Sequence, residues 1–486
     1  MSLTPLFRRK TMANINADLS DVSHGLKRVL GPWHLIALGI GAVIGAGIFA
    51  SVGTAAAGDL VRPGAGPALV ISFLVTAVAC GFAALCYAEF AAMVPISGSA
   101  YTYSYATLGE LIAWIIGWDL IIEYAVGNIA VAISWSGYFV QLLAGLGMHL
   151  PLWLTTDLRT ALSHPEIVQA APHFGSLPII FNLPAVGIIV FLTILLVIGI
   201  KESSWFNVVM VAIKLVTLTA FVLVGFFYIR PENWHPFAPN GWAGIHAGAA
   251  IIFFSYIGFD AVSTVAEECR NPGRDMPIGI IGSLLICTLI YIVVTVVITG
   301  MIPYTQLNVS EPLALALNVV GANRMAGWIS LGAVVATTSV LLVFQLGQPR
   351  ILFSMARDGL LPPWCAKVHP KYRTPHVTTI LTGVFVGFFA AFASLDEMID
   401  LCNIGTLFAF ILVCIGVWVM RYQEPNLPRK FRVMGLPLVA TLGVVSCFYL
   451  AYALPAVTWW RFAVWLVVGM MIYVFYSRKH SRLNVS

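Results

Sequence analysis

Charged side chains are scarce in this sequence of 486 residues: Asp, Glu, Lys and Arg make up 10% of it, whereas soluble domains carry about 25%. Hydrophobic residues make up 59%, and the mean hydropathy is +0.91. This balance excludes an ordinary soluble domain. It predicts an all-α polytopic membrane protein.

Several other features are missing. The first 31 residues are polar and lack an apolar core, so no cleavable signal peptide is predicted. The eight cysteines lack the paired spacing of a zinc site or a disulfide framework. No spaced His/Asp/Glu cluster or nucleophile motif stands at membrane depth, which argues against an enzyme. We therefore expect no metal and no cofactor.

Twelve apolar segments are long enough to span a bilayer. They lie near residues 32–52, 68–92, 112–142, 184–200, 205–228, 246–265, 278–300, 325–350, 376–394, 397–421, 434–453 and 457–476. Of the 26 Lys and Arg residues, 20 fall on segments predicted to be cytoplasmic and five on external ones. This asymmetry predicts that both termini are cytoplasmic. It also explains the net charge of +5 without a nucleic-acid partner. We expect a multi-pass protein of the plasma (inner) membrane.

The first segment carries four glycines, Gly39, Gly41, Gly45 and Gly47, where a spanning helix should be most regular. Each glycine costs a helix about 1 kcal/mol relative to alanine. Irregular backbone at membrane depth survives where it is buried in protein or lines a wet cavity. The cluster therefore indicates either a broken helix at a binding site or a small-residue packing face.

The sixth segment is interrupted in the same way, by Ser255, Gly258 and Asp260. Broken segments five apart predict two five-helix units, one inverted relative to the other. Unwound carbonyls of the sixth helix would bind an ammonium group, and amides of the first would bind a carboxylate. An α-amino acid carries both groups. Asp260 either adds negative charge near this site or caps the second half-helix.

Three further charged residues lie inside predicted spans. Asp119 and Glu123 are four residues apart and so share one helix face, and intramembrane carboxylates usually face a bundle interior or an aqueous cavity. Lys214 lies about 14 Å into the fifth segment. An amine so deep is costly to keep charged, which suits a proton carrier. The alternative is a structural lysine in a salt bridge, for instance to Glu123.

The remaining polar positions are less specific. Thr337, Thr338 and Ser339 in the eighth segment either line a cavity or bond back to their own helix. Asn403 in the tenth segment is a candidate outer-gate residue. The Ser/Tyr-rich stretch 93–105 predicts a half-buried intracellular helix or an interfacial aromatic belt. We expect residues 145–183 to form a short helical cap.

Several separated motifs resemble the amino acid–polyamine–organocation superfamily. They are Gly39–Phe49, Tyr87–Tyr105 and Phe253–Pro272. Within it, the sequences GWDLIIEY from Gly117, IKESS from Ile200 and GQPRILFSMARDGLL from Gly347 are similar to the cationic amino acid transporter branch. The resemblance covers nearly the whole chain.

The resemblance implies a leucine-transporter-type fold with twelve transmembrane helices and broken helices 1 and 6. Its expected divisions are a cytoplasmic tail (1–31), two five-helix repeats (32–228 and 246–421), helices 11 and 12 (434–476) and a second tail (477–486). It implies proton coupling through Lys214, aided by Glu123. The substrate-binding residues that it implies are Ile40, Ala42, Val43, Gly45, Ala46, Gly47, Phe253, Phe254, Ser255 and Ile257, with Phe254 closing over the substrate. Glu123 and Asp260 are added to this site for their charge at membrane depth.

The function expected from the sequence is proton-coupled transport of amino acids, cationic or of broad specificity, by alternating access. The alternatives are a neutral amino acid or polyamine carrier, an exchanger, and a substrate-gated channel or sensor on the same scaffold. A channel would need a continuous polar lining, whereas polar residues here cluster around two segments. Expected partners are the amino acid and the lipid bilayer. Whether a small single-span accessory subunit is a further partner is left open by the sequence.

Overall fold

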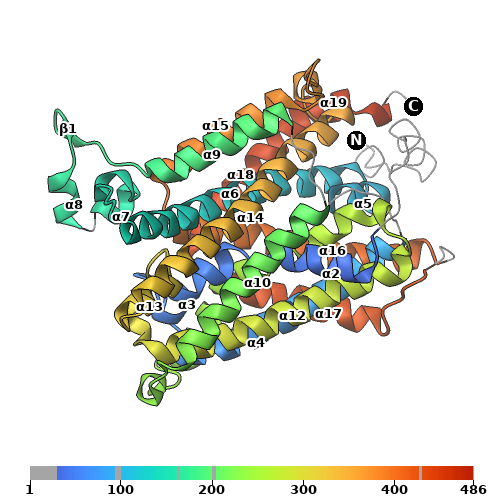
Figure 1. Ribbon diagram of the computed structural model, residues 1–486. Coiled ribbons are helices and arrows are strands. Elements are labelled where there is room, and N and C mark those ends of the chain that lie inside the picture. Colours follow the sequence, from blue (N-terminus) through green and yellow to red (C-terminus); the bar gives the residue numbers. More distant parts are fainter. Residues whose placement is uncertain (1–29, 94–99, 163, 200–203, 426–428, 485–486) are drawn as a thin grey trace.

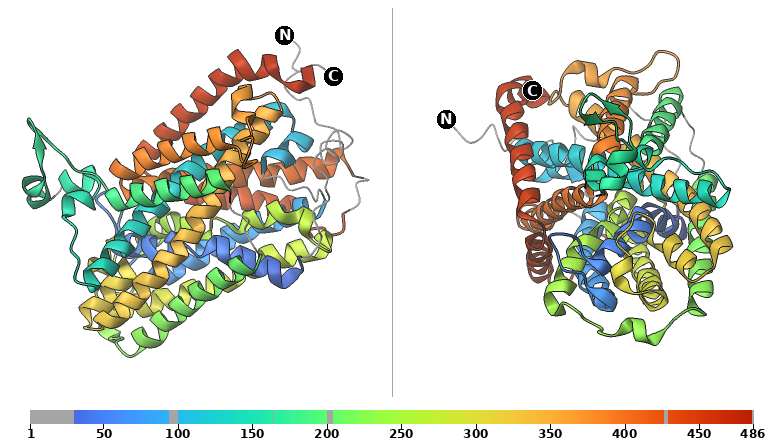
Figure 2. Two further views of the ribbon diagram at one scale, coloured as in Figure 1. Left: turned by 45° about the horizontal axis from the view of Figure 1, so that its top comes forward. Right: turned by 90° about the vertical axis from the view of Figure 1, so that its left-hand side faces the viewer.

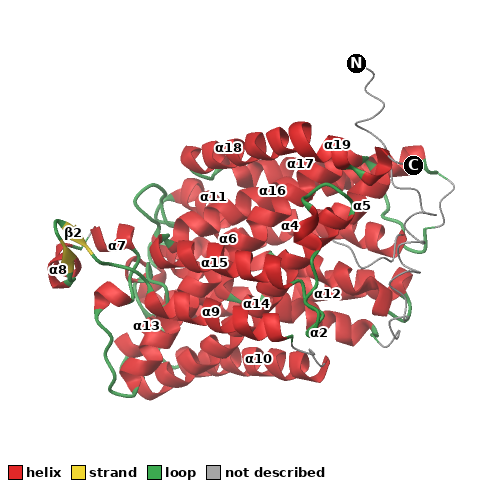
Figure 3. Cartoon of the chain, turned by 90° about the horizontal axis from the view of Figure 1, so that it is seen from above, coloured by secondary structure: helices red, strands yellow, loops and turns green. Residues whose placement is uncertain are grey.

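The computed structural model describes residues 30–93, 100–162, 164–199, 204–425 and 429–484. Most of the predicted tail 1–31, and residues 94–99 and 200–203 of the quoted motifs, lie outside the described residues. The described chain is almost entirely helical (Figure 3). The exception is a hairpin of two short strands, β1 (His173–Phe174) and β2 (Leu177–Pro178).

Eight helices in the described part are long and apolar enough to cross a membrane, or nine when one bent pair counts as a span. Seven of them correspond to α4 (Leu69–Met93), α6 (Glu110–Gly145), α10 (Ser204–Phe226), α12 (Pro272–Met301), α14 (Asn323–Arg357), α16 (Leu395–Gln423) and α18 (Ala456–Ile472). The eighth, Gly241–Ser263, begins with α11 (Gly241–Ile252), and the bent pair begins with α2 (Pro32–Val43).

Three shorter apolar helices, α9 (Leu183–Ile198), α15 (His376–Phe392) and α17 (Leu436–Tyr452), lie on the other predicted spans. Two helices run beyond their predicted limits. α12 starts already at Pro272, a residue favoured in the first turn, and α14 continues through Pro349 to Arg357. The reason is that apolarity marks the part of a helix within the bilayer, whereas the helix itself extends past it.

The two ends of the bundle differ (Figure 1). One end carries α7 (Leu158–Leu162), α8 (Pro165–Ala170) and β1, which together form the cap expected over 145–183, with strands added to its helices. The other end carries α5 (Ala100–Thr107) and α19 (Arg478–His480). Tyr101 and Tyr105 of α5 are buried, as expected for a half-buried helix in the Ser/Tyr-rich stretch.

Helices α17 and α18 lie along one side of the bundle (Figure 2), with α10 at the opposite edge from α18 (Figure 3). These outer helices expose large apolar side chains, including Phe448 at 53% and Val464 at 60%. Polar residues such as Asp119, Asn128 and Lys214 are buried instead. A surrounding of hydrocarbon requires this arrangement, with apolar residues on the outside of the bundle and hydrogen-bonding groups on the inside.

Candidate substrate site at two broken helices

The first break lies between α2 and a π-helical turn, η1 (Gly47–Ser51), which continues into α3 (Val52–Ala57). Ile44 is extended, with φ −75° and ψ 102°, and the two halves are bent by 44°. A Cβ added to Gly47 would lie 2.3 Å from the Cα of Ser255. Glycine is therefore needed at Gly47 because the backbone of the sixth helix passes directly against it.

The second break follows α11. A short helical turn, η5 (Phe253–Tyr256), leads to extended Ile257 and to Gly258, whose φ is +118°. A further helical stretch, η6 (Phe259–Glu268), begins after it. Gly258 also packs so closely on the first helix that an added Cβ would lie 2.8 Å from the carbonyl oxygen of Ala42. Both the positive φ and the close approach require glycine here, and the two breaks are in contact.

Side chains from two other helices bind carbonyl oxygens at the breaks. The Tyr291 hydroxyl of α12 lies 3.1 Å from the oxygen of Val43 and 2.8 Å from that of Ser255. The Asn403 amide of α16 donates to the oxygen of Ala250 over 2.8 Å. A broken helix leaves such oxygens without an intrahelical donor, and an unpaired carbonyl is costly in a membrane. The surrounding scaffold therefore stabilises the irregular backbone.

Lys214 lies in the middle of α10 and is fully buried. Its ammonium donates a hydrogen bond of 2.5 Å to the carbonyl oxygen of Gly41, in the last turn of α2. Among the described residues it forms no ion pair with a carboxylate. The alternative of a salt bridge to Glu123 is therefore wrong, because α10 places the amine against the first helix rather than against α6.

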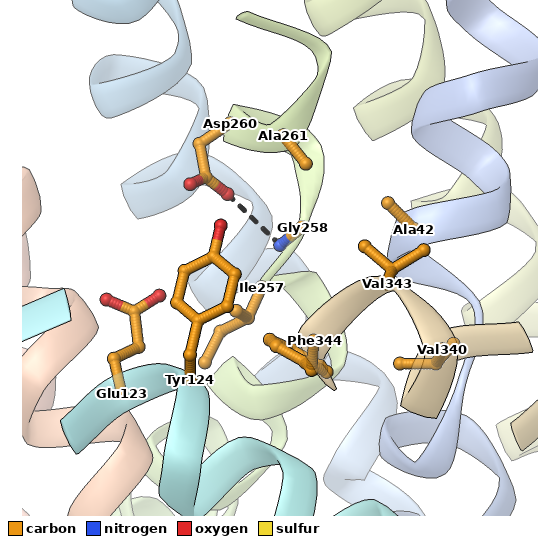
Figure 4. A pocket seen from close by; sticks show the side chains of 10 residues that line it. All are labelled: Ala42, Glu123, Tyr124, Ile257, Gly258, Asp260, Ala261, Val340, Val343 and Phe344. Carbon is orange, nitrogen blue, oxygen red and sulfur yellow. Dashed lines mark hydrogen bonds between the residues drawn. The ribbon is translucent and has the colours of Figure 1, made fainter. Parts of the chain in front are cut away.

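A pocket opens beside the two breaks (Figure 4), with an empty volume of about 330 Å³ counting the part open to solvent. One wall is apolar and comes mainly from α14, through Val340, Val343 and Phe344. The opposite side is polar. The other lining residues are Ala42, Glu123, Tyr124, Ile257, Gly258, Asp260 and Ala261.

The polar side of the pocket is acidic. Asp260 accepts a hydrogen bond of 3.2 Å from the backbone amide of Gly258 and so stabilises the start of η6. It also lines the pocket. Both of the roles considered for this residue are compatible with its position. Figure 4 shows the Tyr124 hydroxyl pointing toward this carboxylate, with Glu123 beside it. One carboxylate oxygen of Glu123, Oε2, is buried and has no hydrogen-bond partner among the residues that the structure describes.

The structure brings part of the predicted site together around the pocket. Ala42, Glu123, Ile257 and Asp260 line it. The other predicted binding residues belong to the two breaks, beside the pocket rather than in its lining: Ile40, Val43, Gly45, Ala46 and Gly47 in the first, and Phe253, Phe254 and Ser255 in the second.

The candidate cavity and gate residues lie elsewhere. The hydroxyls of Thr337, Thr338 and Ser339 donate to carbonyls of their own helix, at Ala333, Val334 and Ala336. Thr338 also accepts from the indole of Trp135. Asn403 contacts the end of α11. None of the four is among the residues that line the pocket.

Sequence reasoning missed the apolar wall. Val340, Val343 and Phe344 are spaced i, i+3 and i+4, so they share one helix face. The same spacing of apolar residues recurs throughout a membrane protein, and it carries no signal that separates a pocket face from a lipid-facing one. Tyr124 could have been found, because it follows Glu123 directly.

The cap end carries a buried group of ion pairs. Arg62, which follows the first helix, donates to Asp59 and to Asp400 at the start of α16, each at 2.6 Å. Burial lowers the pKa of Arg62, but the charges of Asp400 and Asp59 outweigh this effect, and its pKa is raised. The guanidinium therefore stays charged and links the first helix to the tenth.

A second ion-pair network lies at the opposite end. Glu89 of α4 is fully buried and accepts from Arg421, at the end of α16, over 2.5 Å and from the amide of Val433 over 2.8 Å. Both ends of the protein thus connect α16 to the first two helices. Among the described residues, no group of three or more His, Cys, Asp or Glu could hold a metal ion.

Two helices interrupted at mid-bundle, in contact with each other and beside a partly polar pocket, define the class of polytopic membrane transporters. Comparison with known proteins gives the family. The amino acid permease family matches residues 30–475, and the chain belongs to that family. It is thereby a member of a transporter family and not an enzyme, and the resemblance to the amino acid–polyamine–organocation superfamily is confirmed.

Two relatives from Bacillus subtilis (strain 168) match over nearly their full length. The branched-chain amino acid permease BcaP is 48% identical over 480 residues, 99% of each chain. The methylthioribose transporter is 46% identical over 482 residues, 99% of this chain and all of the relative. The vacuolar cationic amino acid transporter 4 of Arabidopsis thaliana is 38% identical over 453 residues, 91% of this chain and 70% of the relative.

Proposed function

We propose that the protein is a secondary active transporter that carries an α-amino acid by alternating access, in symport with a proton. The proposed fold is the twelve-helix inverted repeat, with α2–α10 as the first five-helix unit and α11–α16 as the second. We place it in the plasma membrane with both termini in the cytoplasm. Membership of the amino acid permease family supports an amino acid as substrate.

The observation that carries the proposal is the contact between the two breaks. Gly47 lies against the backbone of Ser255, and Gly258 lies against that of Ala42. After the first break, the amides at the start of η1 and α3 form a helix N-terminus, which favours a carboxylate. The sixth helix offers backbone carbonyls near Ile257, which favour an ammonium. An α-amino acid carries both groups.

For the substrate side chain, the pocket favours the neutral alternative over the cationic one. Val340, Val343 and Phe344 offer no polar atom, and Asp260 already accepts from the Gly258 amide. We therefore propose small or branched apolar amino acids as substrates. The match to a branched-chain permease agrees with this choice. A cationic side chain is the second candidate, supported by the unpartnered Oε2 of Glu123 beside the pocket.

Proton coupling is assigned to Lys214. Its hydrogen bond to Gly41 fastens α10 to the half-helix before the first break. A neutral amine keeps two N–H groups but loses the charge that strengthens this bond. Loss of the proton would therefore loosen the first helix, and coupling follows if the two access states differ in their affinity for the proton.

The test is uptake of radiolabelled leucine, alanine and arginine into liposomes that contain the purified protein, with and without an inward proton gradient. We expect gradient-driven uptake of leucine and alanine. Lys214→Ala should abolish accumulation but keep exchange of labelled for unlabelled substrate. Thr217→Ala is the matched control, because Thr217 lies on the same helix and bonds to its own backbone at Ile213.

Each alternative predicts a different result. If uptake by the wild type does not depend on the proton gradient, the protein is an exchanger or a uniporter and not a symporter. Accumulation by Lys214→Ala would make the lysine structural. Arginine as the preferred substrate would favour the cationic candidate.

A further inference from the structure

Asp119 is a buried carboxylate that the proposed mechanism does not use. It lies on α6, one turn before Glu123, and is fully buried. Neither of its carboxylate oxygens has a hydrogen-bond partner among the described residues, and no ion pair reaches it there. On the facing helix it lies against Gly405 of α16, where an added Cβ would be 3.0 Å from Oδ1.

The Thr406 hydroxyl of α16 bonds to Glu123. The titratable groups around Asp119 and Glu123 in the described part of the chain are all acids. From α6 they are Glu123 and Tyr124, from α4 Tyr87, from α16 the Cys402 thiol, and from η6 Asp260. No Lys, Arg or His in the described part of the chain pairs with either carboxylate. Burying an ionised carboxylate without a donor or a cation is prohibitively costly, so such a group takes up a proton instead.

Asp119 is also connected to the pocket. Glu123 lies about 6 Å further along the same helix face, at 1.5 Å per residue, and it lines the pocket. Its own Oε2 is buried and finds no hydrogen-bond partner in the described part of the chain. Since Gly405 has no side chain, none stands between the Asp119 carboxylate and the backbone of α16. On the predicted topology, Asp119 lies on the cytoplasmic side of Glu123.

We propose that Asp119 is a second proton-binding site, distinct from Lys214, which exchanges its proton with the substrate pocket through Glu123. This inference rests on the proposed proton-coupled function. The ligand is a proton. In the conformation described here the acid holds its proton, and it releases the proton toward the cytoplasm when α6 and α16 separate. Lys214 lies against the first helix and Asp119 against α16, so the two sites lie at different helix contacts.

The experiment uses Asp119→Asn, which keeps the size of the side chain and mimics its neutral form. Ser134→Ala is the matched control, because Ser134 is another fully buried polar residue of α6 whose hydroxyl has no hydrogen-bond partner within the described ranges. The number of protons moved per substrate is measured in liposomes. A leucine gradient is fixed, and the proton gradient is varied until the net flux of leucine stops. The ratio of the two gradients at that point gives the number of protons per leucine. Exchange of labelled for unlabelled leucine is measured in parallel.

We expect Asp119→Asn to keep exchange within about twofold of the wild type and to move one proton fewer per substrate, while Ser134→Ala matches the wild type. An unchanged proton count would overturn the proposal, because Asp119 would then be a permanently neutral structural acid. Loss of exchange in a folded Asp119→Asn protein would overturn it too. If leucine uptake by the wild type itself does not depend on the proton gradient, the proposed proton symport is wrong, which is a different failure from that of the Asp119 site.

A second measurement does not depend on the variant folding. Infrared difference spectra of the wild type, with aspartate labelled by carbon-13 at the side-chain carboxyl, record protonated aspartic acid directly. Addition of substrate at a pH favouring transport should remove a labelled acid band. An unchanged band on substrate addition would overturn the proposal.

Discussion

The hydroxyl of Tyr291 lies 2.8 Å from the carbonyl oxygen of Ser255, in the break of the sixth helix. The same hydroxyl lies 3.1 Å from the carbonyl oxygen of Val43, in the last turn before the first break. One side chain of α12 thereby connects both discontinuous helices. Its ring is fully buried and packs edge-on against Tyr256 at 5.6 Å. The two breaks are thus held together from outside the pocket.

Tyr291→Phe removes this connection, because it takes away the one hydroxyl proton that the two buried carbonyl oxygens share. Each unsatisfied buried group costs about 1–3 kcal/mol, so we expect a lower melting temperature and a substrate exchange rate reduced by about tenfold. Tyr473→Phe is the control, because its buried hydroxyl bonds to Glu110, away from the breaks. Equal exchange rates for the wild type and Tyr291→Phe would contradict the connecting role.

Gly47→Ala tests the contact between the breaks. The new Cβ would lie 2.3 Å from the Cα of Ser255, which is backbone and cannot move aside cheaply. We expect binding and uptake of leucine to be lost in a protein that still elutes as a folded species. Gly187→Ala in α9 is the control, since nothing lies within 4 Å of its added Cβ. If Gly47→Ala transports normally, the breaks do not have to touch during the cycle.

The breaks could be predicted from the sequence because helix-weakening residues cluster in the middle of two apolar segments. Gly45, Gly47 and Gly258 each lie where a side chain would collide with a neighbouring element, and each weakens a regular helix. The spans were predictable for a similar reason, since lipid demands long apolar helices. Both signals are local properties of the chain.

The pocket wall and the partner of Lys214 were not predictable, because both depend on tertiary packing. Val340 and Phe344 have the same chemistry as residues that face lipid, and only the position of α14 turns them inward. The sequence shows a lysine at membrane depth and a carboxylate that could pair with it. The actual acceptor is a backbone oxygen, at Gly41, and any residue type could provide it.

The ion pair of Arg62 and Asp400 lies at the end of the bundle that is predicted to be external. Both side chains are 6% exposed, and removing one partner of a buried pair costs about 3–5 kcal/mol. We expect Arg62→Ala to favour the outward-open state. A cysteine placed in the pocket by Val343→Cys should then react faster with an impermeant thiol reagent added outside. The eight native cysteines are buried, so their background is low.

The control for this experiment is Arg159→Ala. Arg159 pairs with Glu397 at the same end, but its side chain is 62% exposed, and exposed pairs contribute about 0–1 kcal/mol. Labelling should therefore match that of the intact protein. If Arg62→Ala leaves the labelling rate unchanged as well, the pair is structural and does not control access.

Phe344→Ala tests whether the pocket holds the substrate side chain. Phe344 lines the apolar wall and packs edge-on against Tyr124 at 5.4 Å, so its removal enlarges the pocket on the side away from Asp260. One methylene in an apolar site changes discrimination by about 1–3 kcal/mol. We therefore expect the uptake efficiency of phenylalanine relative to alanine to rise by about tenfold or more. Phe388→Ala on α15 is the control, because that ring is 60% exposed on the outer surface. A ratio that Phe344→Ala leaves unchanged would place the side chain elsewhere, and the breaks alone would then define the binding site.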